Sequence, residues 1–293
     1  MALNAKRVQK PFRKLRKLLR RMPRQPLPHQ VHDLRTHTRE LEAMAAALSL
    51  DSHSSVKRLL KDLARIRKRA GKVRDLDVLT SYAAILHPQG EEDCSVQLLE
   101  HLGAQRRKKA RKLHAVVAKY GSEARGELKQ SSRTFERQLC QSEDSDCDPE
   151  DAAARATASA LKLERELAAP LRLDRRNLHP YRLKVKELRT VLRMAEESDG
   201  VEAFVDVLGE VKDSIGAWHD WEELLSMARE VLDHGTACKL LRELKRTCGD
   251  KYDAALTRTE NLRRSYFPGP RGKNSQSRKP TEPVWTARTA IAA

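Results

Sequence analysis

Apolar residues recur every three or four positions along most of the chain, which is the spacing of one face of an α-helix. In the first such segment, residues 3–22, the apolar stripe is formed by Val8, Phe12, Leu15 and Leu19. Glycine and proline are sparse inside the periodic segments, and the alternation of apolar and polar residues that marks a half-buried strand is nearly absent. The pattern therefore predicts an all-α protein.

Breaks in this pattern and turn-forming residues set the bounds of the predicted helices. Gly71 and Gly216 are predicted to end helices. Asp75 and Asp220 would then begin the next helices and cap them by accepting hydrogen bonds from free backbone amides. The expected helices cover residues 3–22, 30–48, 54–70, 75–86, 95–120, 122–140, 152–168, 178–197, 201–215, 220–232 and 236–267.

An acidic segment separates these helices into two sets. Residues 141–151 contain six acidic residues, no basic residue and no apolar run. We interpret this segment as a linker between a first helical half, residues 1–140, and a second helical half, residues 152–267. The remaining residues, 268–293, are rich in proline, glycine, serine and basic residues, which predicts a disordered basic tail.

The two halves repeat one another in sequence. The segment V-H-D-L-R-T-H-T-R-E-L at residues 31–41 aligns with L-H-P-Y-R-L-K-V-K-E-L at residues 178–188, at an offset of 147. Further on, I-R-K-R-A-G-K-V-R-D at residues 66–75 aligns with V-K-D-S-I-G-A-W-H-D at residues 211–220, at an offset of 145. Because order, offset and residue types agree, we predict an internal duplication that folds as two helical bundles. The paired positions are His32 with His179, Arg35 with Arg182, Arg39 with Lys186, Gly71 with Gly216, Arg74 with His219 and Asp75 with Asp220.

The amino-acid composition indicates the class of partner and the cellular compartment of the protein. The chain has 58 lysine and arginine residues against 41 acidic residues, a net charge of +17 that favours an anionic partner. Aromatic residues make up only 4% of the chain, so the core is expected to be aliphatic. The five cysteines form no C-x-x-C pair, and neither a membrane-spanning apolar stretch nor a secretory signal is found. We therefore expect a reduced, cytoplasmic protein that does not enter a membrane.

Two of the repeated helices carry a stripe of basic residues on one face. His32, Arg35 and Arg39 occupy positions i, i+3 and i+7, and His179 begins the matching stripe. Cations on one ridge repel each other unless an anion lies there, and the planar guanidinium group suits phosphate oxygens. A single stripe is usually an ordinary solvated face, but its repetition favours a shared anion site. The second stripe consists of His179, Arg182, Lys186 and Arg189.

Other basic segments are weaker candidates. The stripe Lys61, Arg65, Lys68 and Lys72 keeps only Lys212 as a clear counterpart in the second half. The segment at residues 105–112 is so densely basic that its charge must surround the helix, and much of it is expected to be solvated.

The sequence contains no pattern that predicts catalysis. The pairs His32-Asp33 and His219-Asp220 resemble the doublet of metal-dependent phosphohydrolases, but their arginine and lysine neighbours would oppose a divalent cation. Serine–histidine–acid arrangements, phosphate-binding glycine loops and a distinct acid/base pair are also not found. We therefore expect no metal, no cofactor and no enzymatic activity.

The repeated segments resemble the CHAD family, the conserved histidine α-helical domain. The resemblance rests on V-H-D-L-R and G-K-V-R-D-L-D-V-L in the first half, and on L-H-P-Y-R-L-K-V-K-E-L-R and G-A-W-H-D-W in the second. It extends over residues 5–267 and implies two helical bundles related by a pseudo-twofold axis. It also implies a central basic cavity or groove that binds inorganic polyphosphate, in a binding module and not an enzyme.

Matching positions give the candidate polyphosphate-binding residues. Two departures stand out, since Lys186 replaces the arginine of the first stripe and Glu42 occupies the position of Arg189. The E-x-E-x-K signature of the triphosphate tunnel domain fused to some relatives is missing, which argues against hydrolysis. The candidates are His32, Arg35, Arg39 and Arg74 in the first half, and His179, Arg182, Lys186, Arg189, Lys212 and His219 in the second.

Two alternative functions remain open at this point. Binding to a nucleic-acid backbone is the second choice, because phosphate contacts are not specific for sequence. An enzyme subunit that acts on polyphosphate is the third. Association with polyphosphate granules and regulation of an enzyme are both compatible with polyphosphate binding. The histidines could contact the ligand or pack between helices.

Overall fold

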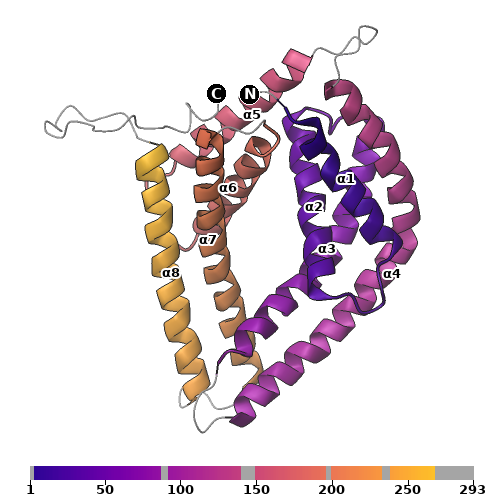
Figure 1. Cartoon of the computed structure of the whole chain (residues 1–293). Coiled ribbons are helices and arrows are strands. Elements are labelled where there is room, and N and C mark those ends of the chain that lie inside the picture. Colours follow the sequence, from indigo (N-terminus) through magenta and orange to yellow (C-terminus); the bar gives the residue numbers. More distant parts are fainter. Residues whose placement is uncertain (1–2, 87–91, 140–148, 196–198, 233–237, 268–293) are drawn as a thin grey trace, which may run out of the picture.

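The computed structural model describes residues 3–86, 92–139, 149–195, 199–232 and 238–267 (Figure 1). These residues form eight helices, and the only β-type pairing among them is an isolated bridge between Leu3 and Ala195. The all-α prediction is confirmed. The helices are α1 (Ala5–Arg20), α2 (Pro28–Ala47), α3 (Ser54–Ala83), α4 (Glu92–Leu139), α5 (Pro149–Ala168), α6 (Leu178–Leu192), α7 (Asp199–Val231) and α8 (Lys239–Tyr266).

The helices fall into two groups along the chain. Helices α1–α4 lie on one side of the molecule in Figure 1 and pack on one another, while α5–α8 form the other side. The groups meet where α2 packs on α6 and where α3 packs on α7. The two helices that begin with a basic stripe, α2 and α6, therefore lie next to each other at the centre.

Helix α1 shows how the apolar pattern builds this arrangement. Its apolar stripe is buried, and most of its lysines and arginines are exposed on the opposite face. The Asn4 side chain caps the helix by accepting a hydrogen bond from the Arg7 amide (3.2 Å). The Asn4 amide in turn donates to the Met194 carbonyl (2.8 Å), which ties the start of the chain to the second group of helices.

The predicted helix breaks at Gly71 and Gly216 are wrong. Helix α3 continues through Gly71 and α7 continues through Gly216, so Asp75 and Asp220 lie inside helices and do not cap them. A glycine inside a helix costs only about 1 kcal/mol relative to alanine, which tertiary packing readily offsets. Helix α4 likewise runs unbroken through Gly121, where two helices were expected.

The helix that follows the acidic segment begins earlier than predicted. Helix α5 begins at Pro149, so the last three residues of the predicted linker form its first turn. Proline is well suited to the first helical position, and Glu150 and Asp151 are favoured there by the helix dipole. Residues 141–148 of the linker, the 87–90 turn and the 268–293 tail lie outside the described residues.

The core that holds these helices together is mainly aliphatic, as its composition predicts. Its largest side chains include Trp218, which is only 1% exposed, and Trp221 is also buried. Phe12 of α1 meets Phe135 of α4 edge to face, with ring centroids 5.0 Å apart. Within the described part of the chain, no helix has the length and apolar character needed to cross a membrane.

Candidate anion-binding site

A cavity of about 690 Å³ lies between α2, α3, α6 and α7. Nine of the ten predicted site residues line it, although they come from segments almost 150 positions apart in the sequence. Helix α2 contributes His32 and Arg35, and α3 contributes Arg74. The remaining six are His179, Arg182, Lys186 and Arg189 from α6, with Lys212 and His219 from α7.

The tenth residue, Arg39, lies beside this cavity and not in its lining. It lines a neighbouring cavity of about 430 Å³ between α2, α5 and α6, and Lys186 lines both spaces. Seven residues of helix place Arg39 about 10 Å further along α2 than His32. Its buried Nε has no hydrogen-bond partner among the described residues.

Glycines position the arginines of the site. A Cβ atom on Gly216 would lie 2.6 Å from Arg182 Nη2, so only glycine leaves room for this guanidinium group against α7. Arg182 Nε donates to the Lys212 carbonyl at 3.0 Å, which fixes the group in that place. In the first half, a Cβ on Gly71 would lie 3.9 Å from Arg35 Nε, a looser version of the same packing.

A third arginine follows the same rule. A Cβ on Gly209 would lie 3.2 Å from Arg189 Nε, which donates to the Val205 carbonyl at 3.1 Å. Arg182 and Arg189 are seven residues apart on α6, and Gly209 and Gly216 are seven residues apart on α7. This shared spacing is present in the sequence, but Gly209 lies inside the predicted helix 201–215 and its role was not predicted.

The cations of the site are crowded and only partly compensated. Burial lowers the pKa of Arg182 and Arg39 from its ordinary value, and neighbouring arginines lower it further. The effect is largest at Lys186, where burial and the charges of Arg39, Arg35, Arg182 and Lys212 lower the pKa to about 7. The crowding of these cations therefore carries an electrostatic cost that an anion would relieve.

Acidic residues also line the cavity, and the sequence did not single out most of them. Asp75 Oδ1 lies 3.7 Å from Arg35 Nη1, and Asp213 Oδ1 lies 2.8 Å from Lys212 Nζ. Burial raises the pKa of Asp75 and Asp220, although nearby arginines act in the opposite direction. The carboxylates in the lining are Glu40, Asp75, Asp213, Asp220 and Glu223. Because seven lysines and arginines face these five carboxylates, the net charge of the lining is positive.

The histidines lie close to this cationic cluster. The rings of His179 and His219 are 4.5 Å apart between centroids. Burial lowers the pKa of His179, as do the charges of His219 and Arg182. Partial burial and the charge of Arg74 also lower the pKa of His32. Without a bound anion, the histidines that begin the two stripes, His32 and His179, therefore favour the neutral form at physiological pH.

The aromatic ring in the lining is packed against the core. Tyr82 stacks on Trp221 with ring centroids 4.7 Å apart and planes 6° apart. Trp221 is buried, so this stack covers one face of the Tyr82 ring. A row of open aromatic faces, which single-stranded nucleic-acid sites use for base stacking, is not found in the part of the cavity described here.

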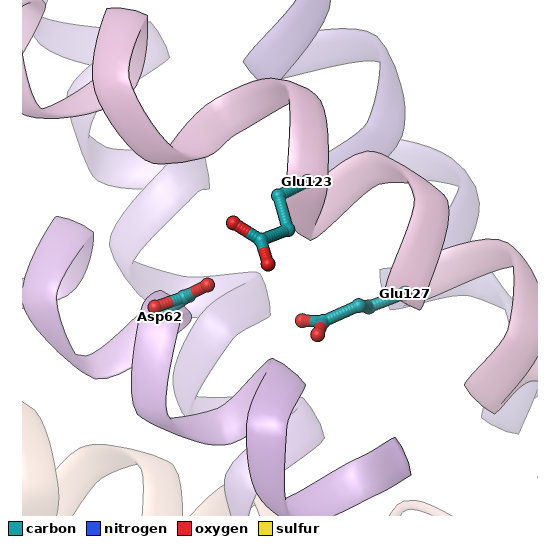
Figure 2. Close-up of side chains that lie close together, drawn as sticks. All are labelled: Asp62, Glu123 and Glu127. Carbon is teal, nitrogen blue, oxygen red and sulfur yellow. The ribbon is translucent and has the colours of Figure 1, made fainter.

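A separate group of carboxylates is the best arrangement for a metal ion in the described residues. Figure 2 shows Asp62 of α3 facing Glu123 and Glu127 of α4, with their oxygens within 4.8 Å of one another. Arg65 donates to Asp62 at 2.9 Å, and Arg58 lies 3.9 Å from Glu127, so arginines offset part of this charge. These carboxylates do not line the basic cavity. The sequence did not predict them as a group because the residues of α3 and α4 lie far apart along the chain.

Comparison with known proteins identifies the family. The family model described as the CHAD domain matches residues 6–233, which is most of the chain, and the chain therefore belongs to the CHAD domain family. The crystal structure of the CHAD domain from the plant Ricinus communis matches with a TM-score of 0.61 at 14% identity, over 90% of this chain and 91% of that one. At this identity the match establishes the fold alone. Comparison with curated proteins yields no match.

Proposed function

We propose that this protein binds inorganic polyphosphate in the cavity between α2, α3, α6 and α7. The observation that carries the proposal is the convergence of nine predicted basic residues and histidines on one cavity. Polyphosphate is a linear, flexible polyanion without bases, so charge and guanidinium geometry are the features that recognise it. A bound polyanion would relieve the repulsion that lowers the pKa of Lys186.

We infer that the two halves arose by duplication and that the ligand lies between them. Arg35 packs near Gly71 and Asp75 in the first half, as Arg182 packs on Gly216 near Asp220 in the second. The same three residue types recur in the same spatial relation, and both arginines line one cavity. A pseudo-twofold arrangement would present similar cations to a symmetric, repeating ligand.

Binding without cleavage is the form of the proposal that the chemistry favours. Asp213, one of the carboxylates in the lining, forms an ion pair with Lys212, which opposes its use as a general base. Incubation of the protein with polyphosphate and magnesium should leave the chain length unchanged on a gel. Release of orthophosphate that a cavity substitution abolishes would establish an enzyme instead.

Titration with two ligands tests the function itself. Long-chain polyphosphate and single-stranded RNA should be titrated separately at physiological salt, because ionic strength decides the affinity of both. We expect tighter binding of polyphosphate, since the lining lacks open stacking faces in the described residues. Clearly tighter binding of RNA would make the protein a nucleic-acid-binding protein. Polyphosphate binding would fit a cytoplasmic protein that associates with polyphosphate granules.

A further inference from the structure

Lys186 occupies an unusual position between two cavities. It lines both the 690 Å³ cavity and the neighbouring 430 Å³ cavity, so it lies at the boundary between the two spaces. The charges around it are Arg35 and Arg39 from α2, Arg182 from α6 and Lys212 from α7. Within the described part of the chain, neither a hydrogen bond nor an ion pair holds the Lys186 ammonium group.

Two acids that line the smaller cavity together with Lys186 are paired with other cations. Glu166 of α5 lines the smaller cavity but binds Lys184 Nζ at 2.8 Å. Glu42 of α2 accepts a hydrogen bond from Arg67 at 2.8 Å. Glu187 lines the same cavity and is exposed, and desolvation raises the pKa of its carboxyl group. The charges that act most strongly on the amine are those of four cations.

This environment makes the Lys186 amine a nucleophile at neutral pH. With its pKa lowered to about 7 by burial and by four cations, roughly half or more of the amine is unprotonated near pH 7.4. An ordinary lysine, with a pKa of about 10.4, has about one amine in a thousand unprotonated at that pH. Desolvation and neighbouring cations are the means by which enzymes activate catalytic lysines.

We propose that Lys186 is a site of acylation by acyl phosphates. The proposal rests on the proposed function, because the guanidinium groups of Arg35 and Arg182, which line the larger cavity together with Lys186, would hold the phosphate group of the donor. The amine nitrogen attacks the carbonyl carbon and forms an amide bond. The bond between that carbon and the phosphate oxygen breaks, orthophosphate leaves, and the amine proton passes to solvent.

The donor's own charge offsets only part of the activation. An acyl phosphate brings about two negative charges, whereas four cations lower the pKa of Lys186. The surroundings of the amine therefore remain positive with the donor bound. The product is a neutral amide that can no longer take up a proton when a polyanion binds, so the acylated cavity should bind polyanions more weakly.

The matched control is Lys184, which lies two residues away on the same helix and is paired with Glu166. The full-length protein is incubated with acetyl phosphate at pH 7.4, and mass spectrometry measures acetylation at each lysine over time. We expect Lys186 to react at least about tenfold faster than Lys184, with a rate that rises with pH to a midpoint near 7. In the Lys186→Arg variant, labelling of Lys184 should be unchanged. Equal rates at the two lysines would overturn the proposal.

A second reagent separates this proposal from the proposed function. Acetic anhydride carries no phosphate, so it reports the reactivity of the amine alone. Selective labelling of Lys186 by acetic anhydride but not by acetyl phosphate would overturn acylation by acyl phosphates. Selective labelling by acetyl phosphate that excess orthophosphate suppresses would support it. If that protein showed no affinity for polyphosphate, the acylation site would stand and the proposed function would fail.

Discussion

Replacing Lys186 with methionine should stabilise the fold and weaken anion binding at the same time. Methionine has a similar length and fills the same space, but it removes a half-buried ionisable amine that lies among four cations. Binding sites commonly hold such unfavourable groups at the expense of stability. The variant therefore separates what the site needs from what the fold needs.

The size of the gain follows from linkage between protonation and folding. The pKa of Lys186 is lowered from 10.5 to about 7, so at pH 7.4 folding removes a proton that the unfolded chain keeps. The cost spans about 3.1 pH units at about 1.36 kcal/mol each, or at most about 4 kcal/mol. Because the folded-state pKa is lowered, this cost is absent above pH 10.5 and grows as the pH falls to about 7. Below that pH it stays constant.

Urea unfolding of wild type and variant at pH 7.4 and pH 9.5 measures this difference. We expect Lys186→Met to raise the free energy of unfolding by a few kcal/mol at pH 7.4, and by about 3 kcal/mol less at pH 9.5. The control Lys184→Met, on the same helix as Lys186, removes the ion pair with Glu166 of α5 and should lower the free energy of unfolding by about 1 kcal/mol or less. A Lys186→Met variant that is destabilised, or whose gain does not depend on pH, would refute the reasoning.

Two further results are expected from the same site. Gly216→Ala should weaken polyphosphate binding several-fold in a titration, because the new Cβ would displace Arg182. Gly71→Ala should leave the affinity unchanged and stabilise α3 by up to about 1 kcal/mol. Equal effects of the two substitutions on affinity would contradict this packing. Polyphosphate should bind more tightly as the pH falls from about 9 to 6, because the anion would raise the lowered pKa values of Lys186, His32 and His179 and so take up protons. Lys186→Met should lose the part of this dependence above pH 7, and an affinity independent of pH would assign all three residues to the scaffold.

The sequence was sufficient to predict the helices but not where they continue. Apolar periodicity places each helix, because burial of one face decides the local structure. Gly216, which suggested a helix end, serves a tertiary purpose because it makes room for Arg182, whereas a Cβ on Gly71 would make only an ordinary contact with Arg35. A single sequence contains no local signal that distinguishes these two roles of glycine.

The basic side of the site was predictable for a different reason. Two stripes of cations at matching positions in a repeat are informative even without a structure, and nine of the ten residues indeed line one cavity. Glu40, Asp213 and Glu223 were not singled out, because isolated carboxylates on a charged helix look like ordinary solvated residues. Their proximity to the cations depends on how α2 and α7 pack, which no local pattern encodes.

Salt dependence of polyphosphate affinity tests the central claim most directly. The affinity of wild type should be compared with that of Arg35→Ala/Arg182→Ala and of a control, Arg107→Ala/Lys109→Ala, which removes the same charge from α4 outside the cavity lining. Circular dichroism should show equal helicity in all three proteins. We expect the cavity variant to bind more weakly and its slope of log affinity against log salt to fall by about one per arginine, with little change in the control. Equal losses in the two variants would mean that general surface charge, and not this cavity, binds the polyanion.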